Sequence, residues 1–274
     1  MRLLRKIGPM LRGDVRPWAL VTGAGSGIGL ATARGLAASG YRIVAVDRDG
    51  QALAAASLPA GCLPVQHDIA DVAVDLWSLI DESVAVEVLV NNVGVMAGRS
   101  FTELPVAEAA RVLHTNIVGT WAVSRAVVDR MLARGTTGSV VFNLSLHSSR
   151  VRMSPDYSAS KAALLMLMRE MAVELAPRGI RVNAVSPGAI DTGHGPAVDG
   201  DRHRAAVDAM IPARRLGTPQ DVARVITWLC SPEAAYVTGA DIPVDGGLFH
   251  YNWLHHLYGD AATERDRHQS DSPG

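Results

Sequence analysis

The chain has 274 residues and a formal net charge of −1, with 48% hydrophobic and only 19% charged residues. A near-neutral chain without a basic excess does not predict nucleic-acid binding, and no apolar run approaches the roughly 18 residues that span a membrane. The two cysteines, Cys62 and Cys230, are far apart in the sequence, so they predict neither a disulfide framework nor a metal site, and both thiols are expected to be reduced and buried.

The chain divides into an arm, a domain and a tail. Residues 1–16 are rich in arginine and lack the continuous apolar run of a signal peptide, so a cytoplasmic location is expected. Residues 17–250 have the length and hydrophobic content of a single folded domain. Residues 251–274 are mostly polar and are predicted to be a C-terminal tail.

The domain begins with a strand, a glycine turn, a helix and a second strand. Residues 18–21 form a short apolar run, and the stretch TGAGSGIG follows at residues 22–29. Residues 30–39 are helical in pattern, and residues 41–46 are again apolar and strand-like. This order within about thirty residues is the context in which a glycine turn binds a dinucleotide.

The glycines of this turn have separate physical roles. Gly23 permits a tight turn after the strand, Gly27 lets the backbone approach a pyrophosphate, and Gly29 lets the helix pack close to the sheet. The free N–H groups at the start of the helix favour phosphate binding. The predicted phosphate-binding residues are Gly23, Ser26, Gly27, Ile28 and Gly29.

Asp47 closes the second strand, where an adenosine ribose is expected. A carboxylate at this place accepts hydrogen bonds from both ribose hydroxyls and repels a 2′-phosphate, which favours NAD. Arg48 follows directly and could instead bind that phosphate, so NADP remains the alternative cofactor.

Strands and helices continue to alternate along the chain. Further strands are predicted over residues 63–66, 84–90, 138–143, 180–185 and 240–244, and helices over residues 71–83, 105–134, 157–176 and 219–230. This pattern predicts an α/β fold, a doubly wound, Rossmann-like parallel sheet of about seven strands with helices on both faces. Such sheets bind ligands at the carboxyl ends of their strands.

Tyr157 and Lys161 lie four residues apart at the start of a predicted helix, so their side chains share one face. A free tyrosine, with a pKa of about 10, is a poor proton carrier at neutral pH, and a nearby ammonium group favours the phenolate. A tyrosine in this setting can move a proton on and off an alcohol oxygen. The alternative is a surface tyrosine and a solvated lysine.

Several motifs, in this order, resemble those of the short-chain dehydrogenase/reductase family over about residues 17–248. They are TGAGSGIG at 22–29, NNVG at 91–94, Asn116, Ser145, YSASK at 157–161 and SPG at 186–188. Val93 replaces the alanine that the family usually has. The interval from Ser145 to Tyr157 is 157 − 145 = 12 positions, one fewer than expected, so Ser148 and Ser149 are rival candidates for the serine.

The resemblance implies a Rossmann-type catalytic domain over residues 17–250. Its activity would be hydride transfer between a nicotinamide cofactor and a secondary alcohol or ketone. Tyr157 would be the general acid/base, Lys161 would assist it and hold the nicotinamide ribose, and Ser145 would stabilise the substrate oxygen. Asn116 would support a water that links Lys161 to solvent.

The resemblance also implies contacts to cofactor and substrate. Further cofactor contacts would be Asp68, Ile69, Asn92, Val93, Gly94, Tyr157, Lys161, Pro187, Gly188, Ile190 and Thr192. Substrate contacts are predicted at Val95, Leu146, His147, Met153 and His194, and no metal site is predicted. Family members often assemble through the two long helices, so a homotetramer or homodimer is expected. The alternatives are an NADPH-dependent carbonyl or acyl-thioester reductase and a non-catalytic dinucleotide-binding regulator.

Overall fold

The computed structural model describes residues 16–193 and 210–251, and their centre is a seven-stranded sheet. All of its strand pairs are parallel, and the strand order is β3-β2-β1-β4-β5-β6-β7. The strands are β1 (Trp18–Thr22), β2 (Arg42–Asp47), β3 (Leu63–Gln66), β4 (Val86–Asn91), β5 (Gly138–Asn143), β6 (Ile180–Pro187) and β7 (Asp241–Val244). The predicted doubly wound α/β fold is confirmed.

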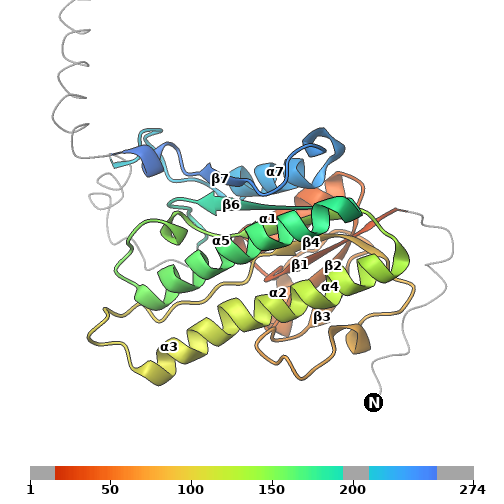
Figure 1. Cartoon of the computed structure of the whole chain (residues 1–274), viewed down its shortest axis with the longest axis horizontal. Coiled ribbons are helices and arrows are strands. Elements are labelled where there is room, and N and C mark those ends of the chain that lie inside the picture. Colours follow the sequence, from red (N-terminus) through yellow and green to blue (C-terminus); the bar gives the residue numbers. More distant parts are fainter. Residues whose placement is uncertain (1–15, 194–209, 252–274) are drawn as a thin grey trace, which may run out of the picture.

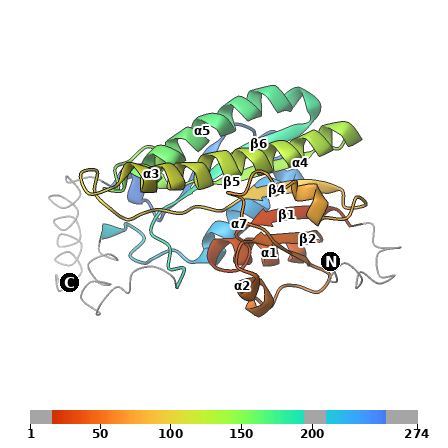
Figure 2. The ribbon, with the colours of Figure 1, turned by 90° about the horizontal axis from the view of Figure 1, so that it is seen from below.

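Helices cover both faces of the sheet, so that the molecule has three layers (Figures 1 and 2). They are α1 (Gly27–Ala38), α2 (Gly50–Ala55), α3 (Val106–Leu113), α4 (Thr120–Arg134), α5 (Pro155–Leu175) and α7 (Pro219–Cys230). Successive strand residues point to opposite faces. Leu20 therefore packs in the core beneath α4 and α5, and Val21 in the core beneath α1 and α7.

The predicted helix over residues 105–134 is present, but it is not a regular α-helix throughout. Helices α3 and α4 are joined by a π-helical segment, His114–Gly119, which contains Asn116. Single π-turns inside α-helices are frequent at functional sites.

The predicted helix over residues 71–83 is wrong. Only a 3-10 turn, Leu76–Leu79, forms there. The Asp75 carboxylate accepts the Trp77 N–H at 3.0 Å, and the Asp81 carboxylate accepts the Ser83 N–H at 2.8 Å. Such local bonds satisfy the backbone without a helix and so compete with helix formation. The short helix α2, which begins at the Asp49 cap, was not among the predicted elements.

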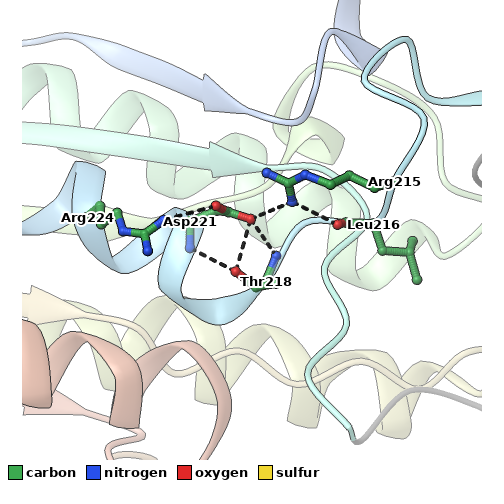
Figure 3. A network of polar contacts seen from close by, with 5 residues as sticks. All are labelled: Arg215, Leu216, Thr218, Asp221 and Arg224. Carbon is green, nitrogen blue, oxygen red and sulfur yellow. Dashed lines mark hydrogen bonds and ion pairs between the residues drawn. The ribbon is translucent and has the colours of Figure 1, made fainter.

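Helix α7 has the predicted ends, and its first turn is held by a polar network (Figure 3). Thr218 and Asp221 form a capping box, in which each side chain accepts the other residue's backbone N–H. Arg215 donates to the Asp221 carboxylate at 2.7 Å and to the Leu216 carbonyl at 3.0 Å. The network thereby fixes the segment that leads into the helix.

The two thiols differ in their surroundings. Cys230 is buried, as expected, and burial raises its pKa to about 12. Cys62 is only half-buried, so the expectation of a buried thiol is wrong at this position. Its place directly before β3, at the edge of the sheet, explains the partial exposure. Among the described residues, no helix is long and apolar enough to cross a membrane.

Candidate active site

A cavity of about 910 Å³ crosses the carboxyl ends of the strands. At one end it is lined by residues that follow β2 and β3, and at the other by residues that follow β5 and β6. Seventeen of the predicted cofactor-binding residues line it: Gly23, Ser26, Gly27, Ile28, Asp47, Arg48, Asp68, Ile69, Asn92, Val93, Gly94, Tyr157, Lys161, Pro187, Gly188, Ile190 and Thr192. The eighteenth, Gly29, does not.

Gly29 acts through packing instead. A Cβ at Gly29 would lie 1.9 Å from the carbonyl oxygen of Gly23, so α1 can approach the turn this closely only with glycine there. Gly27 has a φ of +53°, and the atom nearest to a Cβ built on it is Cβ of Thr192, 3.7 Å away. Ser26 caps α1 without a side-chain cap bond, and Ser26, Gly27 and Ile28 face the cavity. The first-turn N–H groups of α1 thus lie at the cavity wall.

The Asp47 carboxylate is held in place at the end of β2. One oxygen accepts the Gly25 N–H at 2.9 Å, and the other accepts the Asp49 N–H at 3.0 Å. These bonds join the carboxylate to the glycine turn and orient it along the cavity wall beside Arg48.

Tyr157 and Lys161 share one face of α5, as predicted. The Lys161 Nζ lies 5.6 Å from the centroid of the Tyr157 ring and donates to the Asn143 carbonyl at 2.8 Å. Lys161 is buried, and this burial lowers the pKa of its ammonium group, while the nearby Tyr157 acts in the opposite direction.

Ser145 lies two residues after the end of β5 and lines the same cavity as Tyr157. Its Oγ accepts the His147 N–H at 3.2 Å, which orients the side chain at the start of a short 3-10 turn. Neither rival serine lines the cavity, since Ser148 is buried outside it and Ser149 is exposed. The shorter interval before Tyr157 therefore belongs to the loop, and Ser145 and Tyr157 line the same cavity.

Asn116 lies in the π-helical segment and does not line the cavity. It is fully buried, and its side chain hydrogen-bonds the Val95 backbone and Ser160 Oγ. These contacts connect the segment after β4 to α5. The contribution of Asn116 to a water link from Lys161 stays a prediction.

The predicted substrate residues are less well grouped. Val95 lines the cavity, whereas Leu146 is buried, His147 is half-buried, and Met153 is 76% exposed, all three outside the lining. Burial is the main cause that lowers the pKa of His147. His194 lies outside the described residues. The roles of these residues stay predictions.

The structure adds residues that sequence reasoning missed. Asn143 donates to Asn92 Oδ1 at 2.8 Å, and Asn92 in turn donates to the Thr22 carbonyl at 3.0 Å. This chain of amides runs from the glycine turn to the carbonyl that binds Lys161. The position of Asn143 at a predicted strand end was the available signal. Other unpredicted lining residues include His67, Thr115, Arg152, Asp191 and Leu216.

The cavity fits a nicotinamide dinucleotide. Its volume lies in the range typical of cofactor sites, helix N–H groups and a carboxylate occupy one part of its wall, and a phenol, an ammonium and a hydroxyl occupy another. Within residues 16–193 and 210–251, no group of three histidine, cysteine or carboxylate side chains is arranged to hold a metal ion.

Comparisons with known proteins agree with this arrangement. The family model described as "Enoyl-(Acyl carrier protein) reductase" matches residues 23–249. The 3-oxoacyl-(acyl-carrier-protein) reductase MabA of Mycobacterium tuberculosis is 36% identical, over 84% of this chain and 91% of the relative. Galactitol 2-dehydrogenase (L-tagatose-forming) of Cereibacter sphaeroides is 38% identical, over 84% and 93%.

A solved structure shares the fold at a similar level. The gluconate 5-dehydrogenase of Burkholderia cenocepacia, in complex with NADP and tartrate, superposes with a TM-score of 0.79 at 30% identity and covers 86% of this chain and 96% of that one. The family match spans most of the chain, and Ser145, Tyr157 and Lys161 line one cavity together with most of the predicted cofactor-binding residues. The chain therefore belongs to the short-chain dehydrogenase/reductase family and is an oxidoreductase that transfers hydride between a nicotinamide cofactor and an alcohol or carbonyl carbon.

Proposed function

We propose that this protein uses NAD and a secondary alcohol or ketone, with Tyr157 as the general acid/base. The observation that carries the proposal is that Tyr157, Lys161 and Ser145 line one cavity with the glycine turn and Asp47. The bound nicotinamide supplies the hydride chemistry. The protein's residues bind and orient both reactants and carry the proton.

Each side chain has a distinct task in the proposal. The Tyr157 hydroxyl gives a proton to a carbonyl oxygen or takes one from an alcohol. The ammonium of Lys161, whose Nζ lies 5.6 Å from the centroid of the Tyr157 ring, stabilises negative charge that develops on the substrate oxygen and the phenol during proton transfer. The Ser145 hydroxyl donates a hydrogen bond to the substrate oxygen as negative charge develops on it, which contributes a few kcal/mol in related sites.

The remaining contacts are proposed from the same lining. Asp47 binds the adenosine ribose and favours NAD, Asp68 contacts the adenine, and Ile190 and Thr192 contact the nicotinamide. The N–H groups of Gly27 and Ile28 bind the pyrophosphate. Their common cavity supports these roles.

Replacement of Tyr157 by phenylalanine tests the proposal. The change removes only the hydroxyl, so turnover of alcohols and ketones is expected to fall at least about a hundredfold, while NAD binding by calorimetry stays near wild type. Tyr236→Phe is the control, because its side chain is fully exposed. Wild-type turnover in Tyr157→Phe would contradict the acid/base role.

A second candidate is an NADPH-dependent acyl-thioester reductase. Arg48 lines the cavity next to Asp47, and MabA is named as a 3-oxoacyl-(acyl-carrier-protein) reductase. A 2′-phosphate would lie near both charges, so the carboxylate opposes NADPH and the guanidinium favours it. Measurement of 3-oxoacyl-thioester reduction with NADH and NADPH separates the two candidates.

We also infer a homotetrameric or homodimeric assembly in the cytoplasm, built on one catalytic domain over residues 17–250. Trp121 on α4 and Met166 and Val173 on α5 are 55%, 54% and 79% exposed. Exposed apolar side chains on neighbouring helices support an interface there. Sedimentation at micromolar concentration tests the assembly, and a monomer would contradict it.

A further inference from the structure

Arg152 is a lining residue of the cavity from the loop between β5 and α5. Its guanidinium carbon lies 5.7 Å from the centroid of the Tyr157 ring. The strand order separates β2 and β3 from β5 and β6, so Arg152 lies at the opposite end of the cavity from Asp47 and Arg48. The guanidinium is therefore near the reacting atoms rather than near the adenosine part of the cofactor.

The other charged groups at this end are already engaged. Lys161 is buried, and its Nζ donates to the Asn143 carbonyl. The Asp191 carboxylate accepts the Gly193 N–H at 3.2 Å. Among the described residues, no carboxylate forms an ion pair with Arg152, whose side chain is exposed to the cavity. Arg152 therefore presents a positive charge to whatever binds beside Tyr157.

The loop that carries Arg152 is fixed on both sides. Before it, Arg150 lies over the Phe249 ring, 4.6 Å from the ring centroid, and donates to the Phe249 carbonyl. After it, the buried Asp156 carboxylate accepts the Ala97 N–H at 2.9 Å. A side chain on an anchored loop loses less freedom when it binds a ligand than one on a free loop.

We propose that Arg152 is a specificity-determining residue and that the substrate carries an anionic group, a carboxylate or a phosphate, close to its hydroxyl or carbonyl carbon. A guanidinium binds either group with two parallel hydrogen bonds. Because the guanidinium is near the Tyr157 ring, a single small molecule can contact both. The inference rests on the proposed function, since the reacting carbon must lie at Tyr157.

The test compares substrates that carry an anionic group, a carboxylate or a phosphate, with neutral methyl esters. NAD reduction is followed with secondary hydroxy acids, their methyl esters, and phosphate monoesters that keep a free secondary hydroxyl. The wild-type enzyme is expected to prefer an anion over its neutral partner. Arg152→Gln is expected to lower kcat/KM for the anion about 10- to 100-fold, mainly through KM, and to lower it much less for the ester. Whether acids or phosphates are preferred identifies the source of the charge.

Two further variants sharpen the result. Arg152→Lys keeps the positive charge but not the planar guanidinium that forms two parallel hydrogen bonds. Its loss of kcat/KM for the anion is therefore expected to be smaller than that of Arg152→Gln. Arg99→Gln is the matched control, because Arg99 is an exposed arginine of a neighbouring loop, pairs with Glu108 at 3.2 Å and does not line the cavity. It is expected to leave the ratio of anion to ester unchanged.

The outcomes separate this inference from the proposed function. Equal losses of kcat/KM for anion and ester in Arg152→Gln would overturn the inference while leaving the role of Tyr157 intact. A preference of the wild-type enzyme for esters would do the same. Turnover of neither class would count against the proposed function. In that case calorimetry of the same anions decides the inference, and equal affinity in wild type and Arg152→Gln would overturn it.

Discussion

The side-chain amide of Asn116 makes two hydrogen bonds to one residue, Val95. Its Oδ1 accepts the Val95 N–H at 2.9 Å, and its Nδ2 donates to the Val95 carbonyl at 2.8 Å. Nδ2 also donates to Ser160 Oγ at 2.9 Å. Asn116 thus connects the cavity wall at Val95 to the helix that carries Tyr157 and Lys161, although it does not touch the cavity itself.

Asn116→Ala is therefore expected to destabilise the protein. The change leaves the Val95 N–H and carbonyl without their Asn116 partner and removes one of the two hydrogen bonds of Ser160 Oγ, at a cost of about 1–3 kcal/mol. Urea unfolding measures the loss. Arg111→Ala, at an exposed position of the preceding turn, is the control and should stay within about 0.5 kcal/mol of wild type. Equal unfolding midpoints for the two variants would contradict the bracing role.

Asp47 is expected to set the cofactor preference. Asp47→Asn keeps an oxygen for the Gly25 N–H but removes the charge that repels a 2′-phosphate. The ratio of kcat/KM with NAD to that with NADP should fall about tenfold or more. In Asp47→Ala this ratio should fall by a similar factor, and NAD affinity should also fall, because the Gly25 N–H loses its acceptor. An unchanged ratio in both variants would argue against this reading of β2.

Gly29→Ala should be far more damaging than Gly35→Ala in the same helix. A Cβ at Gly29 would lie 1.9 Å from the backbone oxygen of Gly23, which can move only if the turn moves. Overpacking of this kind costs about 1–3 kcal/mol or more. A Cβ at Gly35 meets only the Thr227 hydroxyl, at 2.9 Å, which is a side-chain atom and not backbone. Thermal unfolding of both variants should differ widely, and similar midpoints would be evidence against close packing of α1.

The Asp221 network should make stability depend on pH. The hydrogen bond from Arg215 is the largest cause that holds the pKa of Asp221 well below its usual range. A depressed carboxyl pKa stabilises the fold fully above the unfolded value of about 3.9 and loses this contribution as the pH falls through the folded value. Asp221→Asn should therefore cost about 0.2–1 kcal/mol at pH 7, the range for a partly exposed ion pair.

The difference between wild type and Asp221→Asn should narrow below about pH 4. Urea unfolding at pH 7 and at pH 3 measures it. Arg224→Gln is the control, because its contact to Asp221 is longer, at 3.4 Å, and its side chain is exposed, so a small effect is expected. A difference that is constant with pH would show that the carboxylate charge does not contribute.

Local signals explain which elements could be predicted from the sequence. Helix α7 has the predicted ends because Thr218, Pro219 and Asp221 specify its first turn locally. The helix predicted over residues 71–83 does not form, because Asp75 and Asp81 each accept a hydrogen bond from the backbone N–H two residues later. The hydrophobic pattern of the sequence does not reveal such bonds.

The candidate site divides in the same way. Its glycine turn and strand ends follow from motif and topology, so most of the cofactor lining was predictable. Arg152 was not, because the path of a loop decides whether an exposed arginine faces a cavity or solvent. The π-helical turn at Asn116 was also hidden, since the sequence pattern is helical on both sides of it.

Because of that π-helical turn, the site depends on the number of residues in the segment as well as on their identity. A π-turn holds one residue more than an α-turn, and each residue of an α-helix advances the side chains by about 100°. Because the π-turn accommodates this extra residue, removal of one residue from His114–Gly119 would restore α-helical spacing and leave α3 and α4 on their faces, but it would change the positions of the residues within the segment. The Asn116 amide would then lose its hydrogen bonds to Val95, although the asparagine itself was kept. A one-residue gap within this segment in a related sequence would therefore mark the loss of this contact even where the asparagine is present.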